Sequence, residues 1–168
     1  MTDEADYNDP DHCTVGVIGE VGNRLFLFYV RQGLTETTVK VEKQQIAVLA
    51  SYLGRIVKEL GRPGHLPDDL SFDGTEEPEW VVGTIGVSYD EEIDRVVVVL
   101  EEVHDEDEEA ESDHVLRIAL TREQAAAFAI HATRLVEAGR PPCPLCGLPL
   151  DPTGHDCPRT NGHRPPVT

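Results

Sequence analysis

The sequence predicts an α+β protein made of two tandem β-β-β-α repeats, followed by a small zinc ribbon or knuckle at the C-terminus. Three observations predict this architecture: two similar segments, an amphipathic helix at the end of each, and a cysteine and histidine cluster near the C-terminus. The chain of 168 residues is long enough for one medium domain and a small module. We expect an acidic, disordered N-terminus at residues 1–12, the duplicated domain at 13–140 and a zinc-binding tail at 141–168.

The strands of the two repeats, at residues 13–61 and 80–140, align along the sequence. Each repeat contains an apolar run, at residues 25–30 in the first and 96–100 in the second. Because these runs are apolar on both faces, they belong at the centre of a sheet. A third strand with one buried face follows in each repeat, and its alternating residues are Thr37, Val39 and Val41 or Leu116, Ile118 and Leu120.

A helix closes each repeat. Apolar residues recur at the i, i+3, i+4 and i+7 positions, and Thr121 with Gln124 forms a capping box at the start of the second helix. A Gly-Arg-Pro sequence at 61–63 and again at 139–141 ends each helix. The predicted apolar faces consist of Ile46, Leu49, Ala50, Leu53, Ile56, Val57 and Leu60 in the first helix, and Ala125, Phe128, Ala129, Ala132, Leu135, Val136 and Gly139 in the second.

Neither repeat, at about fifty residues, could bury its own sheet face. We therefore expect the two repeats to pair about a pseudo-twofold axis, with both helices covering one antiparallel sheet or a barrel-like layer. The segment 61–79 contains three prolines, three glycines and six acidic residues, and is predicted to be a connecting loop.

The tail carries the most specific motif of the chain. Cys143 and Cys146 form a C-x2-C pair followed by glycine, a tight knuckle whose two thiolates suit a tetrahedral zinc ion. Cys157 is the predicted third ligand, and the fourth is His163 or, alternatively, His155. We prefer His163 because the residues after Cys157 allow the chain to loop back. Four protein ligands close the coordination sphere, so we expect one structural Zn2+ ion per chain.

Composition limits the compartment and the partners. The formal net charge is −18; residues 140–168 have three arginines against two aspartates, so they carry +1 and the rest of the chain −19. A body this acidic repels phosphate backbones, and this repulsion counts against nucleic-acid binding by the body. The sequence contains no long apolar run, its acidic N-terminus is unlike a signal peptide, and three of its four cysteines have metal spacing. We therefore expect a cytoplasmic protein without a membrane partner.

Histidines are the first candidates for catalysis. His131 lies on the second helix at the position that Tyr52 occupies in the first, and both flank the apolar face, which favours a boundary residue over a general base. His12 is adjacent to Cys13, but neighbouring residues of a strand point to opposite faces, so they cannot form a nucleophile pair.

Charged residues suggest two further sites. The equivalent arginines Arg24 and Arg95, and likewise Arg55 and Arg134, could frame an anionic ligand between the repeats, although pairing with nearby acids is more common. The acidic loop at residues 101–113 could hold a cation or attract a basic partner. It lacks the ligand spacing of an EF-hand, however, and its composition is typical of a solvated hairpin tip.

Three motifs carry a family resemblance: CPLCG at 143–147, DPTGHDCPRTNGH at 151–163 and LTREQA at 120–125. Through them the chain resembles, over nearly its whole length, an uncharacterised actinobacterial family described as a domain of unknown function, a repeat protein with a zinc-ribbon-like tail. The genes of such proteins lie near those of a kinase-like and a histidine-phosphatase-like protein. The resemblance implies a shared pathway and carries over no catalytic residue.

We expect a non-enzymatic zinc-binding adaptor or regulatory protein that acts through protein–protein contacts, for example with a large assembly such as the transcription machinery. One alternative is an enzyme or small-anion-binding protein whose site lies between the repeats, near Tyr52 and His131. Another is nucleic-acid contact through the zinc tail only. A deep polar pocket between the repeats would favour the first alternative, and a flat, filled interface would favour the adaptor.

Overall fold

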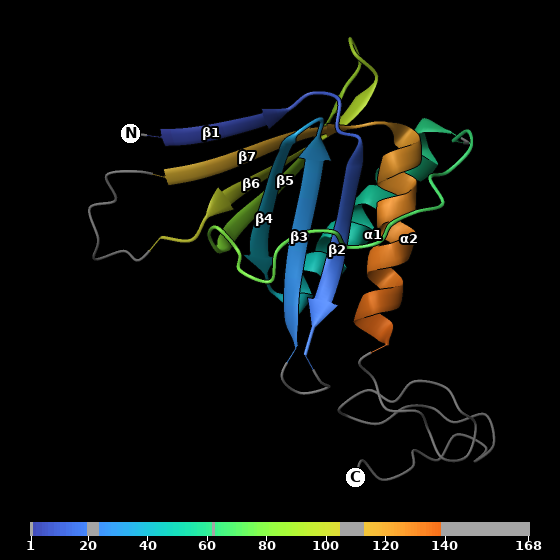
Figure 1. Ribbon diagram of the computed structural model, residues 1–168. Helices are drawn as coiled ribbons and strands as arrows, with labels where there is room; N and C mark the ends of the chain where they lie inside the picture. The colour runs from blue at the N-terminus through green and yellow to red at the C-terminus, as the bar shows by residue number, and fades with distance from the viewer. Residues whose placement is uncertain (1, 20–23, 62, 105–112, 139–168) are drawn as a thin grey trace, which may run out of the picture.

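The computed structural model describes residues 2–19, 24–61, 63–104 and 113–138, which form a mixed α+β structure with two sheets and two helices (Figure 1). No helix in these ranges is long and apolar enough to cross a membrane. The elements in chain order are β1 (Thr2–Tyr7), β2 (His12–Ile18), β3 (Leu25–Gln32), β4 (Thr35–Val41), α1 (Lys43–Leu60), β5 (Val82–Asp90), β6 (Arg95–Glu102), β7 (Asp113–Leu120) and α2 (Arg122–Glu137).

The strands form two open sheets, ordered β2-β3-β4 and β1-β7-β6-β5. The apolar strands β3 and β6 lie inside their sheets, as their composition predicts. Backbone pairing joins β4 to the segment just before β5, where the Lys40 N–H donates to the Trp80 carbonyl at 2.9 Å and Lys40 bridges Val81 in parallel. The expectation of one antiparallel sheet or a barrel-like layer is therefore wrong, because β4 forms only an isolated bridge with the residue before β5 and the strands stay in two open sheets.

Residues 2–7 form a strand, so the expectation of disorder over residues 1–12 is wrong for this segment. β1 pairs in parallel with β7, with Tyr7 opposite Ile118. Its acidic Glu4 and Asp6 are exposed, whereas Tyr7 is buried and its hydroxyl lies 2.6 Å from Thr37 Oγ1. The alternation of exposed and buried residues is that of an ordinary edge strand, and the acids on its exposed face conceal it in the sequence.

The core lies between the sheets and the two helices, which pack against each other. The predicted apolar helix faces are buried or half-buried throughout, apart from Gly139, which lies outside the described residues. Phe28 of β3 packs against Phe128 of α2 with ring centroids 5.4 Å apart. The alternating residues of β4 and β7 are buried as predicted. The segments β2-β3-β4-α1 and β5-β6-β7-α2 share the element order β-β-β-α, with β1 as an additional strand, and their pseudo-twofold relation stays a prediction.

The connecting segment is not a free loop. Its residues 64–72, here called the strap, run beside α2 and cross β2 and β3 (Figure 1). Thr14 Oγ1 donates to the Leu70 carbonyl at 2.7 Å, and the His12 ring donates to the Ser71 carbonyl at 2.6 Å. Phe72 fills the space above Gly16, where an added Cβ would lie 2.5 Å from its ring. The strap thereby covers β2, an edge strand of the three-stranded sheet.

Candidate functional site

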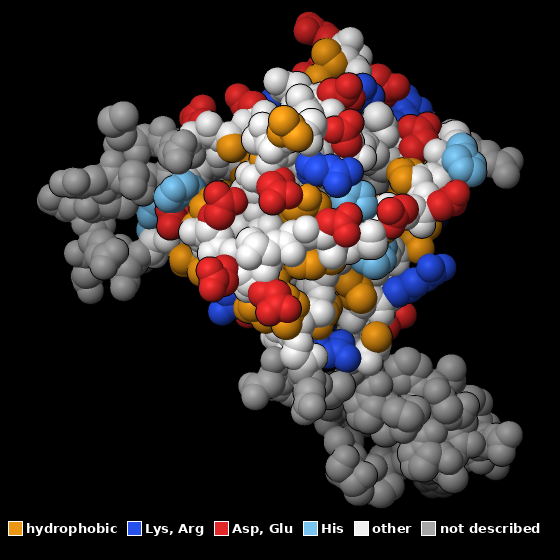
Figure 2. All heavy atoms as spheres, viewed as in Figure 1, with side chains coloured by type: hydrophobic (Ala, Val, Ile, Leu, Met, Phe, Trp, Pro, Cys, Tyr) orange, Lys and Arg blue, Asp and Glu red, His pale blue; other side chains and the backbone are white. Residues whose placement is uncertain are grey.

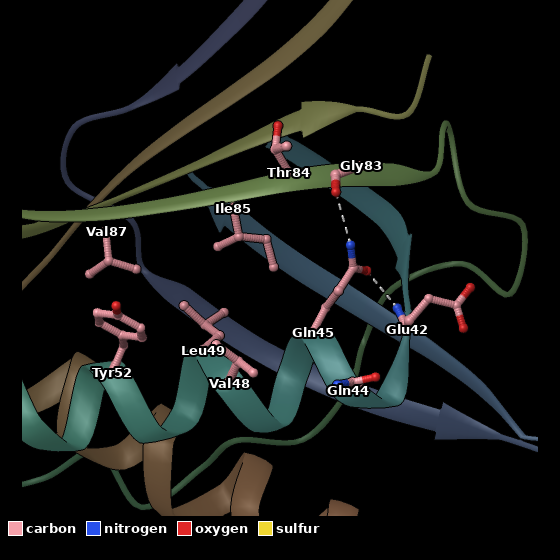
Figure 3. A pocket seen from close by; sticks show the side chains of 10 residues that line it. All are labelled: Glu42, Gln44, Gln45, Val48, Leu49, Tyr52, Gly83, Thr84, Ile85 and Val87. Atoms are coloured by element: carbon pink, nitrogen blue, oxygen red, sulfur yellow. Dashed lines mark hydrogen bonds between the residues drawn. The ribbon is translucent and has the colours of Figure 1, made fainter. Parts of the chain in front are cut away.

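A hollow of about 640 Å³ lies between α1 and β5, and we call it the α1/β5 groove (Figure 3). Ile85 and Val87 of β5 point toward the helix, and Leu49 and Tyr52 of α1 point back toward them. The residues that line the groove are Glu42, Gln44, Gln45, Val48, Leu49, Tyr52, Gly83, Thr84, Ile85 and Val87.

Two sequence patterns build this groove. Val48 and Tyr52 stand one helical turn apart, beside the buried face of α1, and form a second apolar strip. Ile85 and Val87 share a face of β5 because side chains alternate along a strand. Val48 is 51% exposed and Tyr52 is 50% exposed, so both present apolar surface to solvent.

Gln45 closes one end of the groove. Its side-chain Nε2 donates to the carbonyl oxygens of Val82 at 3.3 Å and Gly83 at 3.2 Å, and its Oε1 accepts the Glu42 N–H at 2.8 Å (Figure 3). The β5–β6 register shifts between Val82 and Thr84. At this irregularity a Cβ on Gly83 would lie 2.6 Å from the Cα of Val103, so glycine allows the close approach of these two backbone segments.

At the other end, the Arg55 guanidinium lies 5.7 Å from the centroid of the Tyr52 ring. Among the lining residues, Glu42 and Tyr52 alone have titratable side chains, and there is no histidine, cysteine, lysine or arginine. General acid–base or nucleophilic catalysis requires such groups to converge on a reacting atom. The groove instead offers apolar side chains beside the edge of a sheet, an arrangement suited to binding.

The predicted zinc ligands Cys143, Cys146, Cys157, His163 and the alternative His155 lie outside the described residues. Within the described ranges, no group of three or more histidine, cysteine, aspartate or glutamate residues could hold a metal ion. Cys13 is the free cysteine of these ranges; it is buried, and burial raises the pKa of its thiol. A thiol in that state is a poor nucleophile and a poor metal ligand.

The candidate histidines have structural contacts. His131 donates from Nε2 to the Val15 carbonyl at 3.0 Å, which ties α2 to β2. His12 is bound to Ser71 of the strap, and its strand neighbour Cys13 belongs to the apolar core. His131 also borders a second hollow of about 560 Å³, which lies between α2 and the strap.

The candidate arginines are distributed over several contacts. The Nη2 of Arg95 lies 3.7 Å from Oδ1 of Asp9, and the guanidinium of Arg55 lies over the Tyr52 ring. Arg134 borders the second hollow together with Asp68 and Asp69 of the strap. The Nε of Arg24 is buried without a hydrogen-bond partner among the described residues.

The acidic hairpin is described only at its base. Glu102 of β6 accepts a hydrogen bond from His114 Nδ1 of β7 at 2.7 Å, and this contact holds the pKa of Glu102 below its usual value. The His114 ring stacks on Trp80, with centroids 5.8 Å apart. Residues 105–112 of the predicted acidic loop lie outside the described ranges. Elsewhere, acidic side chains are spread over the visible face of the body (Figure 2).

The fold and the groove define an acidic α+β protein with two open sheets and an apolar groove at a sheet edge. A family model described as "Protein of unknown function (DUF3090)" matches residues 5–157, and the chain belongs to this family. The match includes Cys143, Cys146 and Cys157 of the tail, whereas His163 lies beyond it. Neither a curated protein nor a solved structure matches the chain.

Proposed function

We propose that this protein is a non-enzymatic adaptor, which binds a partner protein through its α+β body and carries one structural zinc ion in its tail. The observation that supports the proposal is the α1/β5 groove, whose exposed Val48 and Tyr52 lie beside the apolar face of an edge strand. Apolar surface that stays exposed on a folded body is typical of sites where other proteins bind.

The chemistry of the groove favours an adaptor over an enzyme. Its two titratable side chains, Glu42 and Tyr52, stand at positions separated by more than two turns of α1. The histidines that sequence analysis considered, His12 and His131, are engaged with backbone carbonyls of the strap and β2. Neither pairs with a nucleophile in the described ranges, so the contacts of this body fit recognition better than bond-breaking.

The zinc tail would provide the second contact of the adaptor. Three cysteines with His163, or with His155, supply the sulfur and nitrogen ligands of a closed structural zinc site. The tail has few apolar residues with which to build a core, so the metal would organise it. Residues 140–168 carry a net charge of +1 and the rest of the chain −19, so the tail would present a much less acidic surface than the body to the partner or to a larger assembly.

Partner capture followed by reconstitution tests this function. The full-length chain would be used as bait in an extract of its own source, with Tyr52→Asp and Cys143→Ser as parallel baits, and each captured protein would be purified separately. We expect one of these proteins to form a stoichiometric complex in sedimentation velocity and to bind at least one of the two variants more weakly. If no captured protein reconstitutes, and a small metabolite instead raises the melting temperature and is chemically changed, the adaptor function is wrong.

A further inference from the structure

The outer edge of β5 is open over most of its length. β5 is the last strand of the four-stranded sheet, and β4 bridges only Val81, the residue before β5, through Lys40. Edge strands usually carry lysine or proline, or are covered, because an open edge pairs with other chains. β5 contains neither lysine nor proline. In the described structure this edge can therefore accept another strand.

The other half of the body shows what occupies the corresponding helix face. The aligned positions of Val48 and Tyr52 on α2 are Ala127 and His131, and both border the strap. The Gly64 N–H of the strap donates to Glu123 Oε1 at 2.9 Å. Ala127 is only 6% exposed, compared with 51% for Val48. A segment of the same chain thus lies beside the face of α2 that corresponds to the open face of α1.

Charge indicates the chemistry of a segment that would fit the open face. Residues 82–89 of β5 are uncharged, but acids stand at both ends of the strand: Glu76, Glu77 and Glu79 before it, and Asp90, Glu91 and Glu92 after it. Arg55, above Tyr52, is the cation that contacts the groove lining. A second copy of the chain would bring its own net charge of −18 and the same acids, which opposes self-association through this edge.

We propose that the α1/β5 groove binds an extended segment of a partner protein in which apolar residues alternate and basic residues stand at the ends. The backbone of this segment adds a strand to the outer edge of β5. Every second side chain enters the groove beside Val48, Tyr52 and Ile85, and the terminal lysines or arginines meet the acids that flank β5. The inference rests on the proposed adaptor function and adds to it the binding mode and the chemistry of the partner.

Selection from a displayed library of random nine-residue peptides, the length of β5, tests this inference on the full-length chain. Peptides would be selected on the wild type and counter-selected on Tyr52→Asp. We expect enriched sequences with apolar residues at alternate positions and lysine or arginine at one or both ends. Enrichment of acidic peptides, of sequences without alternation, or of nothing at all would overturn the proposal.

The enriched peptide would then be synthesised with free amides and with every second amide N-methylated. We expect N-methylation to weaken binding by about tenfold or more, because it removes several interchain hydrogen bonds. Val48→Asp and Tyr52→Asp should weaken binding to a similar extent. Leu34→Asp is the matched control: it adds the same charge at a fully exposed apolar residue in the turn between β3 and β4, and should leave the affinity unchanged. Equal affinity for both peptides would exclude strand addition.

The two proposals fail in different ways. If the reconstituted partner binds the full-length chain but Tyr52→Asp and Val48→Asp do not weaken that complex, the groove inference is wrong and the adaptor function stands. If these substitutions instead abolish a concentration-dependent dimer, the occupant of the groove is a second copy of the chain. If peptides bind as expected but no captured protein forms a complex with the chain, the adaptor function is wrong and the groove inference stands.

Discussion

Gln45, at the start of α1, donates its side-chain amide to the carbonyl oxygen of Gly83 at 3.2 Å and so joins the helix of one half to the first strand of the other. Gln124 makes the equivalent contact at the start of α2, where its Nε2 donates to the Pro10 carbonyl just before β2 at 2.7 Å. Each glutamine also accepts the backbone N–H three residues before it, that of Glu42 or Thr121. One residue type thus caps each helix and attaches it to the opposite half.

Replacing Gln45 with alanine should lower the free energy of unfolding by about 1 to 2 kcal/mol, because it removes a capping acceptor and the donor to two backbone carbonyls. Urea unfolding followed by circular dichroism measures the change. Gln44→Ala is the control, since Gln44 is the exposed neighbour. Equal stabilities of the two variants would show that the Gln45 contacts contribute nothing net.

Gly83 and Gly86 give a matched pair on one strand. Gly83→Ala should destabilise the fold by about 1 to 3 kcal/mol, because its Cβ would lie 2.6 Å from the backbone Cα of Val103, which cannot move as a side chain can. Gly86→Ala meets nothing within 4 Å and should be neutral or stabilise by about 0.5 kcal/mol. Thermal unfolding of both variants would test this order, and a similar loss in both would argue against the close approach at Gly83.

Alkaline pH should destabilise the protein through Tyr29. Burial, followed by the hydrogen bond of its hydroxyl to Glu36 at 2.8 Å, raises the pKa of Tyr29 to about 12 from 10.0. A raised folded-state pKa means that the folded protein retains its proton longer than the unfolded chain. This contribution to stability is complete below pH 10 and is lost as the pH rises toward 12.

The expected loss from Tyr29 over this range is about 2 kcal/mol. Tyr29→Phe should therefore flatten the dependence of unfolding free energy on pH above 10, measured by urea titration at a series of pH values. A shallower slope would remain, because burial also raises the pKa of Tyr7. An unchanged slope in Tyr29→Phe would contradict this assignment.

Protein purified without added metal should contain about one zinc ion per chain, since three cysteines and one histidine fill a structural site. Cys143→Ser should lose the zinc, measured by atomic emission, while the circular dichroism of the body is retained. Cys13→Ala should keep it, because Cys13 is buried in the body. Loss in His163→Ala but not in His155→Ala would identify the fourth ligand. Zinc that survives Cys143→Ser would refute the site.

The helices and inner strands could be predicted from the sequence because their periodicity is local. The apolar faces of α1 and α2, the Thr121–Gln124 capping box and the central places of β3 and β6 are confirmed. The division into two sheets could not be predicted, because it depends on β4 forming only one bridge, to Val81 just before β5. β1 was missed because acids conceal its alternation, and its pairing with β7 is long-range.

The groove was only partly predictable. Tyr52 was expected to lie near a site between the repeats, and it lines the α1/β5 groove. Its partners Ile85 and Val87 could not be assigned to the groove, because the sequence does not show which strand lies at an edge of a sheet or which helix faces that strand. One feature of the sequence could have indicated the binding edge: β5 lacks lysine and proline, which is unusual for an edge strand.

The parallel pairing of β1 with β7 has a consequence for synthesis on the ribosome. Tyr7 has no strand partner until Ile118 has emerged, more than one hundred residues later. At about 5 to 20 residues per second, the first strand waits for several seconds while the rest of the body is made. Three of its six residues are acidic, a composition that keeps an unpaired segment hydrated and resists premature association. The acids of β1 thus act before the fold exists, as protection for a nascent chain.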